Sequence, residues 1–225
     1  MADQYPSRFA NRHEGGAALV PLLQQYAGRP DVVVLALPRG GVPVGFEVAQ
    51  GLGAALDIFL VRKLGMPGHP EFAMGAIASG GVRVISDDVV RMYGVRPEAI
   101  ERVAQAEQAE LERREREYRH NHPPIDLEGK TVILVDDGLA TGATMRAAVA
   151  AARKLGPKRV IVAAPVGAAS TCADFRALAD EVVCARTPEP FSAVGLWYQD
   201  FSQTSDDEVR ELLRRHATRP VQAGR

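Results

Sequence analysis

The sequence has few cysteines and no long apolar run, and each scarcity argues against a class of protein. Cys172 and Cys184 are not spaced as a metal site, so we expect two small core residues of a protein from the reducing cytoplasm. No apolar stretch approaches the roughly 18 residues of a membrane-spanning helix. The first residues lack a basic region followed by an apolar one, so we expect no secretory signal.

An excess of charge of either sign is also missing. The chain carries 27 Lys and Arg against 28 Asp and Glu, for a net charge of −1, so nothing in this balance suggests a nucleic acid or a membrane surface as partner. The hydrophobic fraction of 46% and charged fraction of 24% are typical of a soluble globular protein. A length of 225 residues predicts a single domain, residues 1–225, with a sizeable core.

Apolar runs rich in Val, Ile and Leu alternate with helical patterns along most of the chain. Strands are expected at residues 31–37, 56–61, 132–135, 159–164 and 180–184, and helices at 42–52, 145–155 and 170–179. This alternation predicts an α/β fold, a central, mostly parallel sheet flanked by helices. Ligands bind beyond the carboxyl ends of such strands. Four residues follow such runs directly, and we expect their loops to face one crevice: Arg39, Arg62, Asp136 and Pro165.

Two segments interrupt this alternation. Residues 72–77 and 82–85, joined by Ser79-Gly80-Gly81, predict a β-hairpin. Residues 97–120 predict a charged helix, within an insertion at about 96–121, whose mixed charges favour a solvated face with intrahelical ion pairs. Near the C-terminus, Ser205 and Glu208 have the spacing of a capping box that opens a further helix.

The stretch Val132-Ile-Leu-Val-Asp-Asp-Gly-Leu-Ala-Thr-Gly-Ala-Thr144 carries the most specific chemistry. An apolar strand ends in two carboxylates, Asp136 and Asp137, and a loop of small residues leads into a helix. Carboxylates accept hydrogen bonds from vicinal hydroxyls, as on a ribose, and the amides of a glycine-containing loop at a helix N-terminus favour a phosphate. An ordinary turn, with the Asp residues capping the helix, is the alternative.

This stretch resembles the motif of the type I phosphoribosyltransferases that binds 5-phosphoribosyl 1-diphosphate (PRPP). The resemblance implies the fold of that family, with a helical insertion and a small hood over the site. It also implies that Asp136 and Asp137 bind the ribose hydroxyls. The loop that would bind the 5-phosphate consists of Leu139, Ala140, Thr141, Gly142, Ala143 and Thr144.

Leu37-Pro-Arg-Gly-Gly-Val42 follows the first strand. Paired glycines let backbone amides approach an anion, and Arg39 adds a planar cation suited to phosphate. In the phosphoribosyltransferases this position is the pyrophosphate loop, which often contains an unusual cis peptide bond. The resemblance therefore assigns pyrophosphate binding to Arg39, Gly40 and Gly41.

Val61-Arg-Lys-Leu-Gly65 is similar to a segment of adenine and related purine phosphoribosyltransferases whose basic pair contacts the diphosphate. The resemblance implies PRPP binding by Arg62 and Lys63, with Lys63 also catalytic; a surface pair is the alternative. The residues that follow match the mobile catalytic loop of those enzymes, so we expect a lid at about 65–86 with glycine hinges. In it, Glu71 or His69 could protonate or orient a leaving base.

The densest aromatic cluster lies in the expected hood at about 187–203. Phosphoribosyltransferases place there an aromatic residue that stacks on the nucleobase, and the resemblance favours Trp197 for base stacking. A cluster that ties this terminal segment to the core is the alternative.

Motifs along nearly the whole chain resemble, more narrowly, a bacterial group of phosphoribosyltransferases whose acceptor is unassigned. In this group Phe9, Arg12 and Gly15-Gly16 belong to the first helix and its approach, and we assign them no chemistry. Hypoxanthine-guanine enzymes carry an Asp where this chain has Ala140, so a 6-oxopurine is disfavoured as acceptor and an aminopurine stays open.

The resemblance predicts a cytoplasmic enzyme of nucleotide salvage. Its reaction would be Mg²⁺-dependent transfer of phosphoribosyl from PRPP to a nitrogenous, purine-like base, with Mg²⁺ held mainly by PRPP and water. A homodimer is expected by analogy. The alternative is a regulatory protein that binds PRPP or a nucleotide without catalysis. A phosphatase or kinase fits poorly, because neither a P-loop lysine nor a nucleophilic Asp followed two residues later by another Asp is present.

Overall fold

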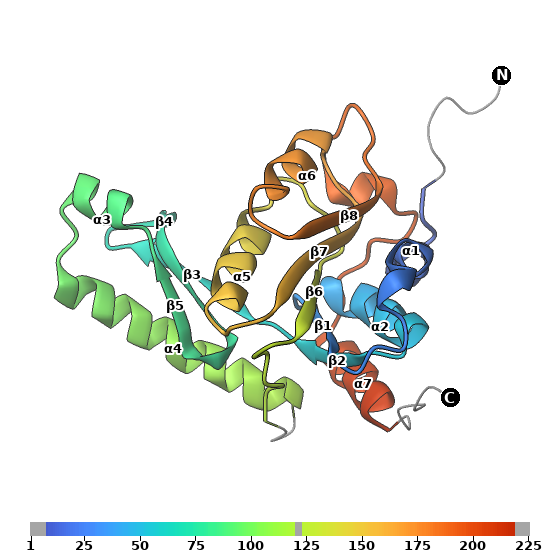
Figure 1. The fold of residues 1–225 in the computed structure, drawn as a ribbon. Helices are drawn as coiled ribbons and strands as arrows, with labels where there is room; N and C mark the ends of the chain where they lie inside the picture. The colour runs from blue at the N-terminus through green and yellow to red at the C-terminus, as the bar shows by residue number, and fades with distance from the viewer. Residues whose placement is uncertain (1–7, 120–122, 219–225) are drawn as a thin grey trace.

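The computed structural model describes residues 8–119 and 123–218, and its centre is a parallel sheet of five strands. The strand order is β2-β1-β6-β7-β8 (Figure 1). The strands are β1 (Val32–Ala36), β2 (Ala55–Ile58), β6 (Thr131–Val135), β7 (Arg159–Val166) and β8 (Glu181–Arg186). Every residue of β1 and β6 is buried, as expected for continuous apolar runs covered on both faces. The predicted α/β fold is confirmed.

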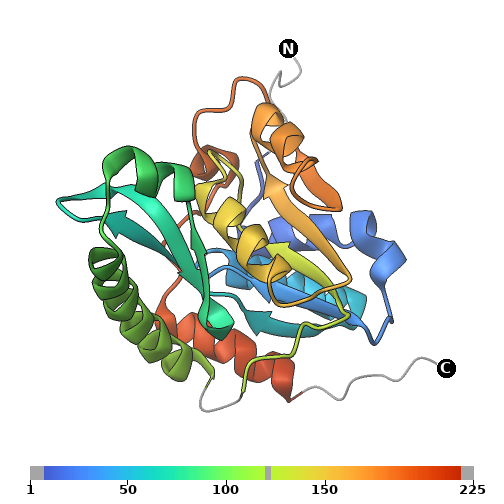
Figure 2. The ribbon, with the colours of Figure 1, turned by 60° about the vertical axis from the view of Figure 1, so that its left-hand side comes forward.

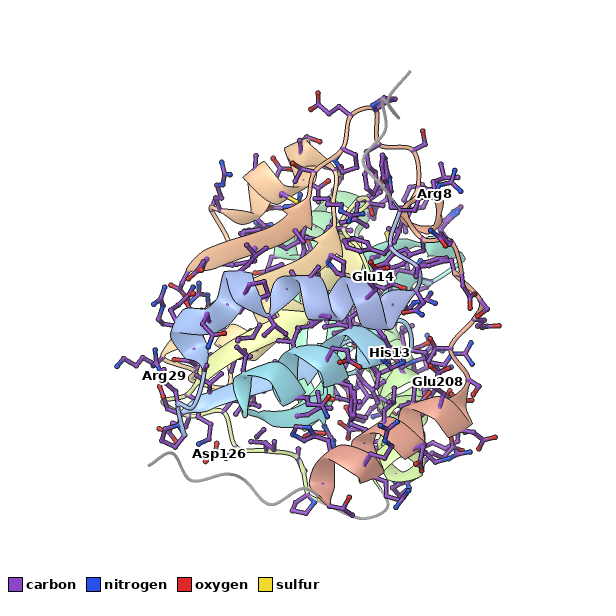
Figure 3. All side chains as sticks on the ribbon, turned by 90° about the vertical axis from the view of Figure 1, so that its right-hand side faces the viewer. Arg8, His13, Glu14, Arg29, Asp126 and Glu208 are labelled. Carbon is purple, nitrogen blue, oxygen red and sulfur yellow. The ribbon has the colours of Figure 1, made fainter. Side chains whose placement is uncertain are left out.

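Helices cover the two faces of this sheet. Helices α1 (Arg12–Leu19) and α2 (Gly41–Leu52), with the 3₁₀ turn η1 (Pro21–Tyr26), cover one face, and α5 (Ala143–Arg153) and α6 (Ala169–Phe175) lie on the other (Figures 1 and 2). Figure 3 shows α1 beside α2, with His13 near one end of α1 and Arg29 toward the opposite side of the molecule. Nδ1 of His13 lies 2.8 Å from Oε1 of Glu47, which joins these two helices.

A second sheet stands beside α5 as an extension of the domain (Figure 2). It consists of β3 (Val61–Met66), β4 (His69–Ala78) and β5 (Val82–Ile85), joined in part by the 3₁₀ turn η2 (Ser79–Gly81). The helices α3 (Asp87–Tyr93) and α4 (Pro97–Arg119) follow, and α4 packs on β3 and on α7 (Asp206–Ala217). The predicted hairpin, charged helix and C-terminal helix are present, and Ser205 caps α7 by accepting the amide of Glu208.

The structure corrects the strand predicted at residues 56–61. Strand β2 ends at Ile58, and Val61 already begins β3 of the second sheet. Residues 59 and 60 are as buried and apolar as those in a strand, so the apolar pattern did not reveal that the chain leaves the first sheet. Arg62 and Lys63 therefore do not stand at the carboxyl end of a strand of the parallel sheet.

The hairpin expected within residues 65–86 is present, and the movement of this segment as a lid stays a prediction. Most of residues 65–86 lie in an antiparallel sheet rather than in a loop, and β4 is ten residues long. Gly75 was expected as a hinge, but a Cβ there would lie 2.3 Å from the carbonyl oxygen of Val84. It is a packing glycine that lets β4 and β5 approach closely.

The helix α4 combines a solvated face with a buried one. Its exposed side carries the predicted intrahelical pairs, among them Glu110 with Arg113 and Arg114. Ala104, Leu111 and Tyr118 are buried in a cluster with the second sheet. In the described ranges, no helix combines the length and apolar character needed to cross a membrane.

A buried ion pair joins the end of α4 to the parallel sheet. Arg119 Nε donates to Asp57 Oδ1 at 2.9 Å, and Arg119 Nη2 donates to the carbonyl of Ile58 at 2.9 Å. Both residues are only 8% exposed. Asp57 also accepts the amides of Ile58 and Ile125, so its carboxylate is well supplied with donors.

We expect Asp57→Ala to lower the free energy of unfolding by about 3–5 kcal/mol, because it removes one of the counter-charges of the buried Arg119, which then keeps its pair with Glu115, and also the acceptor of two backbone amides. Denaturant titration measures this change. Arg91→Ala, which breaks the exposed pair with Asp88, should leave the midpoint nearly unchanged. Equal effects of the two substitutions would contradict this account of the Asp57 pair.

Candidate active site

Two adjacent carboxylates, Asp136 and Asp137, follow β6 at the carboxyl edge of the parallel sheet. The amide of Asp137 donates to Asp136 Oδ1 at 2.8 Å, and Arg12 Nε donates to Asp137 Oδ2 at 2.9 Å. Burial raises the pKa of both carboxyls, and the negative charge of Asp137 raises the pKa of Asp136 further. A ligand that is positively charged, or that donates hydrogen bonds, would offset this cost of burying two charges.

The loop after β1 lies directly against the acid pair. A Cβ on Gly40 would stand 2.1 Å from Asp137 Oδ2, and a Cβ on Gly41 would stand 2.7 Å from the carbonyl oxygen of Val135. Both positions therefore require glycine because of close approach. The Pro38–Arg39 peptide bond is cis, as the resemblance to a pyrophosphate loop implies.

The loop from Leu139 to Thr144 forms a small-residue turn at the N-terminus of α5. Leu139 bridges to Gly167, and the hydroxyl of Thr171 donates to the carbonyl of Ala140 at 2.6 Å, so neighbouring elements hold the loop. Gly142 is the N-cap residue of α5 and has a φ of 69°. It has no side chain that could accept a hydrogen bond from an amide of the first turn. Ala140, Thr141, Ala143 and Thr144 are exposed. An uncapped, exposed helix N-terminus is suited to a phosphate.

The three predicted cations divide between two places. Arg39 lies in the loop beside the acid pair, and its Nη1 is 3.8 Å from Asp206 at the start of α7. Arg62 instead forms an ion pair with Glu107 of α4. Glu107 of the insertion thus supplies an anion for Arg62, which lies in β3 and not after a strand of the parallel sheet as predicted, and its PRPP-binding role stays a prediction. Lys63 is exposed on β3, so its PRPP-binding and catalytic roles stay predictions.

The predicted acid–base residues lie near the start of β4. His69 is exposed, and its ring meets Phe72 edge-on with centroids 6.3 Å apart. The backbone of Glu71 belongs to β4, but its side chain lies outside the described part of the structure. The roles of both residues stay predictions.

The hood is built differently from the expectation. Trp197 is 9% exposed, at the end of the 3₁₀ turn η3 (Val194–Trp197), and belongs to a core cluster with Phe9, Val166 and Tyr198. This burial corrects the assignment of Trp197 as an open stacking ring, and the alternative, a cluster that ties the segment to the core, describes it. Phe201 is more exposed, at 36%.

Sequence reasoning missed two residues that contact the acid pair. Arg12 reaches Asp137 from α1, and the Tyr198 hydroxyl donates to the carbonyl of Asp137 at 2.6 Å. The segment before α1 runs beside the hood, with the amide of Phe9 donating to the carbonyl of Trp197. No local pattern could indicate these contacts, because the partners lie far apart in the sequence.

Comparison with known proteins identifies one family. The phosphoribosyl transferase domain family matches residues 13–195, which include the acid pair, the loop at Gly40 and the start of α5.

Individual relatives carry the same description. The chain is 49% identical over 207 residues to "Putative phosphoribosyl transferase Rv0571c" of Mycobacterium tuberculosis, a match that covers 92% of this chain and 46% of the relative. The chain thus spans about half the length of that curated relative. It is 31% identical over 136 residues to "Bifunctional protein PyrR" of Chloroflexus aurantiacus, over 56% of this chain and 64% of that protein.

A solved structure is similar over nearly its full length. TT1426 from Thermus thermophilus superposes with a TM-score of 0.82 at 43% identity, covering 92% of this chain and 97% of that one. The two chains therefore share their fold over most of their length.

We expect Gly40→Ala to weaken PRPP binding strongly, because the added methyl group must displace the Asp137 carboxylate. Calorimetry with PRPP measures the effect. Gly28→Ala is the control: its φ is 69° and nothing lies within 4 Å of an added Cβ, so it should cost about 1 kcal/mol of stability and leave binding intact. Unchanged PRPP affinity in Gly40→Ala would contradict the close approach described here.

Proposed function

The chain belongs to the phosphoribosyl transferase family, and from that premise we propose that it transfers the ribose 5-phosphate group of PRPP to a nitrogenous base and releases pyrophosphate. The observation that carries the proposal is the convergence of three features at one edge of the parallel sheet. These are the paired carboxylates after β6, the glycine loop that touches them, and the uncapped start of α5.

Each feature has a part in the reaction. The bond between the anomeric carbon and the pyrophosphate oxygen breaks, the bond from that carbon to a base nitrogen forms, and the base nitrogen loses its proton. The carboxylates of Asp136 and Asp137 would accept hydrogen bonds from the ribose hydroxyls. They would also stabilise the positive charge that develops at the anomeric carbon. The Gly40 amide, with Arg39, would bind the departing pyrophosphate, and the start of α5 would hold the 5-phosphate. The Gly41 amide donates to the carbonyl of Leu37 at 3.0 Å, so Gly41 would contribute by its close approach to the acid pair.

Magnesium fits the donor chemistry of this site. In proteins Mg²⁺ is usually bound by one or two carboxylates together with phosphate oxygens and water. The oxygens of PRPP and water would hold most of the ion, which would neutralise charge on the pyrophosphate. The desolvated, like-charged state of the two carboxyls supports a cationic occupant.

A purine-like acceptor, and a place in nucleotide salvage, belong to the same proposal. Ala140 stands where hypoxanthine-guanine enzymes carry an Asp, so an aminopurine is favoured over a 6-oxopurine. Trp197 is buried and Phe201 is 36% exposed, so of these two rings Phe201 is the more open, with the part not in contact with Arg12 and Tyr198 available to a base. A homodimer stays a prediction.

A regulatory protein that binds PRPP without catalysis is the second candidate. The observation that favours it is the arrangement of residues 65–81, which form strands of the second sheet rather than a loop over the site. Pyrophosphate release over a panel of bases, measured alongside PRPP binding, separates the two functions: binding without release with any base would support the regulator.

We expect Asp137→Asn to reduce Mg²⁺-dependent pyrophosphate release, with the best acceptor from that panel, by about a hundredfold or more, because it removes a negative charge from the site where positive charge develops. The asparagine can still accept the Arg12 hydrogen bond, so the fold should be kept. A coupled assay for pyrophosphate measures the rate.

The matched control is Asp31→Asn, which neutralises another carboxylate that is paired with an arginine, Arg29. Asp31 precedes the N-terminal end of β1, and the glycine loop follows its C-terminal end. This variant should retain the wild-type rate. An Asp137→Asn variant that releases pyrophosphate as fast as the wild type would refute the assignment of the acid pair.

A further inference from the structure

Arg12, the first residue of α1, contacts both the acid pair and the hood. Its Nε donates to Asp137 Oδ2 at 2.9 Å, and its Nη1 donates to the carbonyl of Ser202 at 2.7 Å. The guanidinium carbon lies 3.9 Å from the centroid of the Phe201 ring. The Arg12 and Asp137 side chains are only 11% and 17% exposed. Three groups therefore fix this cation, and two of them belong to the hood.

The hood also reaches Asp137 by a second route. The hydroxyl of Tyr198 donates to the backbone carbonyl of Asp137 at 2.6 Å, and the rings of Tyr198 and Phe201 are stacked with centroids 5.2 Å apart. Tyr198 thus holds the backbone of Asp137, and Arg12 holds its side chain. A movement of the hood would change both contacts.

The charge on Asp137 depends on few neighbours. The titratable and charged groups that face it from the described elements are Arg12 of α1, Asp136 of its own loop and Tyr198 of the hood. Arg39, in the neighbouring loop, is paired with Asp206 instead. Burial raises the pKa of Asp137, whereas the hydrogen bond and charge of Arg12 lower it. Arg12 is therefore the cation that opposes protonation of this carboxylate.

We propose that Arg12 is a positioning residue that keeps Asp137 ionised and oriented for the ribose while the hood is seated. This inference rests on the proposed function, because it assigns Asp137 to a ribose hydroxyl. Arg12 holds Oδ2, and the other carboxylate oxygen would accept the hydroxyl. Phe201 and Ser202 of the hood hold the guanidinium of Arg12. A change in the position of the hood when an acceptor binds would therefore move Arg12, and with it the Asp137 carboxylate that would bind the sugar.

The first test is Arg12→Met, which keeps an apolar chain against Phe201 and removes the charge. The pKa of the Asp137 carboxyl, followed by carbon-13 NMR in the ligand-free protein, should rise. Less of the carboxyl is then ionised near neutral pH. The dissociation constant for PRPP with Mg²⁺ should increase about ten- to hundredfold at pH 6–7, and the difference from wild type should narrow as the pH rises toward 9.

Three further variants separate positioning from a general loss of structure. Arg12→Lys keeps the charge and should restore most of the NMR titration. Phe201→Leu removes the ring beneath the guanidinium and should weaken PRPP binding about two- to fivefold. Arg29→Met removes a comparable arginine that pairs with Asp31 and lies over Tyr26, on the far side of the molecule. It should leave both PRPP binding and the Asp137 titration unchanged.

The outcomes distinguish the inference from the function beneath it. A raised Asp137 pKa together with pH-dependent loss of PRPP binding in Arg12→Met supports the inference. If Arg12→Met binds PRPP as the wild type does at every pH, or more tightly, the inference is overturned, while the proposed function stands. If the wild-type protein binds no PRPP, the proposed function fails, and the inference that rests on it fails too.

Discussion

The close packing of Asp137 against Gly40 and Arg12 is the constraint on which the site depends. The acid pair ends a fully buried strand, so its position is set by the core of the sheet. Burial disfavours two adjacent negative charges, and Arg12 offsets this cost from outside the motif. Gly40 leaves the space that the carboxylate occupies. Burial thus raises the pKa of both carboxyls, and the Arg12 guanidinium is the contact that favours the charged form of Asp137.

The surrounding elements converge on this pair from distant parts of the chain. A parallel β-bridge between Phe9 and Tyr198 joins the segment before α1 to the hood. The loop after the acids is held by Gly167 and Thr171, which follow the adjacent strand. The second sheet and α4 are tied to the opposite part of the fold through Asp57 and Arg119. The edge of the sheet that carries the acid pair is thus formed by strands and their first turns.

The parts of the fold that could be predicted are those with a strong local pattern. Strands β1 and β6 were predicted from continuous apolar runs, and α5 from its Ala-rich run and the small residues before it. The end of β2 was not, because Phe59 and Leu60 are buried outside the first sheet and look like strand residues. Helix α3 was missed, since none of its residues is buried.

The same distinction holds at the site. A contiguous motif predicted Asp136, Asp137 and the loop to Thr144, and these lie together. Arg62 was misplaced because a cation in a sequence does not reveal whether its anion is a ligand or another side chain, here Glu107. Trp197 was misplaced because aromatic residues serve cores as well as binding surfaces. No role could be predicted for Arg12, because its contact with Asp137 joins residues 125 positions apart and one sequence does not reveal such a contact.

A crystal structure of the protein soaked with PRPP and Mg²⁺ tests the central claim most directly. The account predicts density for the sugar with its two hydroxyls within hydrogen-bonding distance of Asp136 and Asp137 and its 5-phosphate at the N-terminus of α5. An empty site at saturating PRPP, or a sugar bound away from the acid pair, would contradict it.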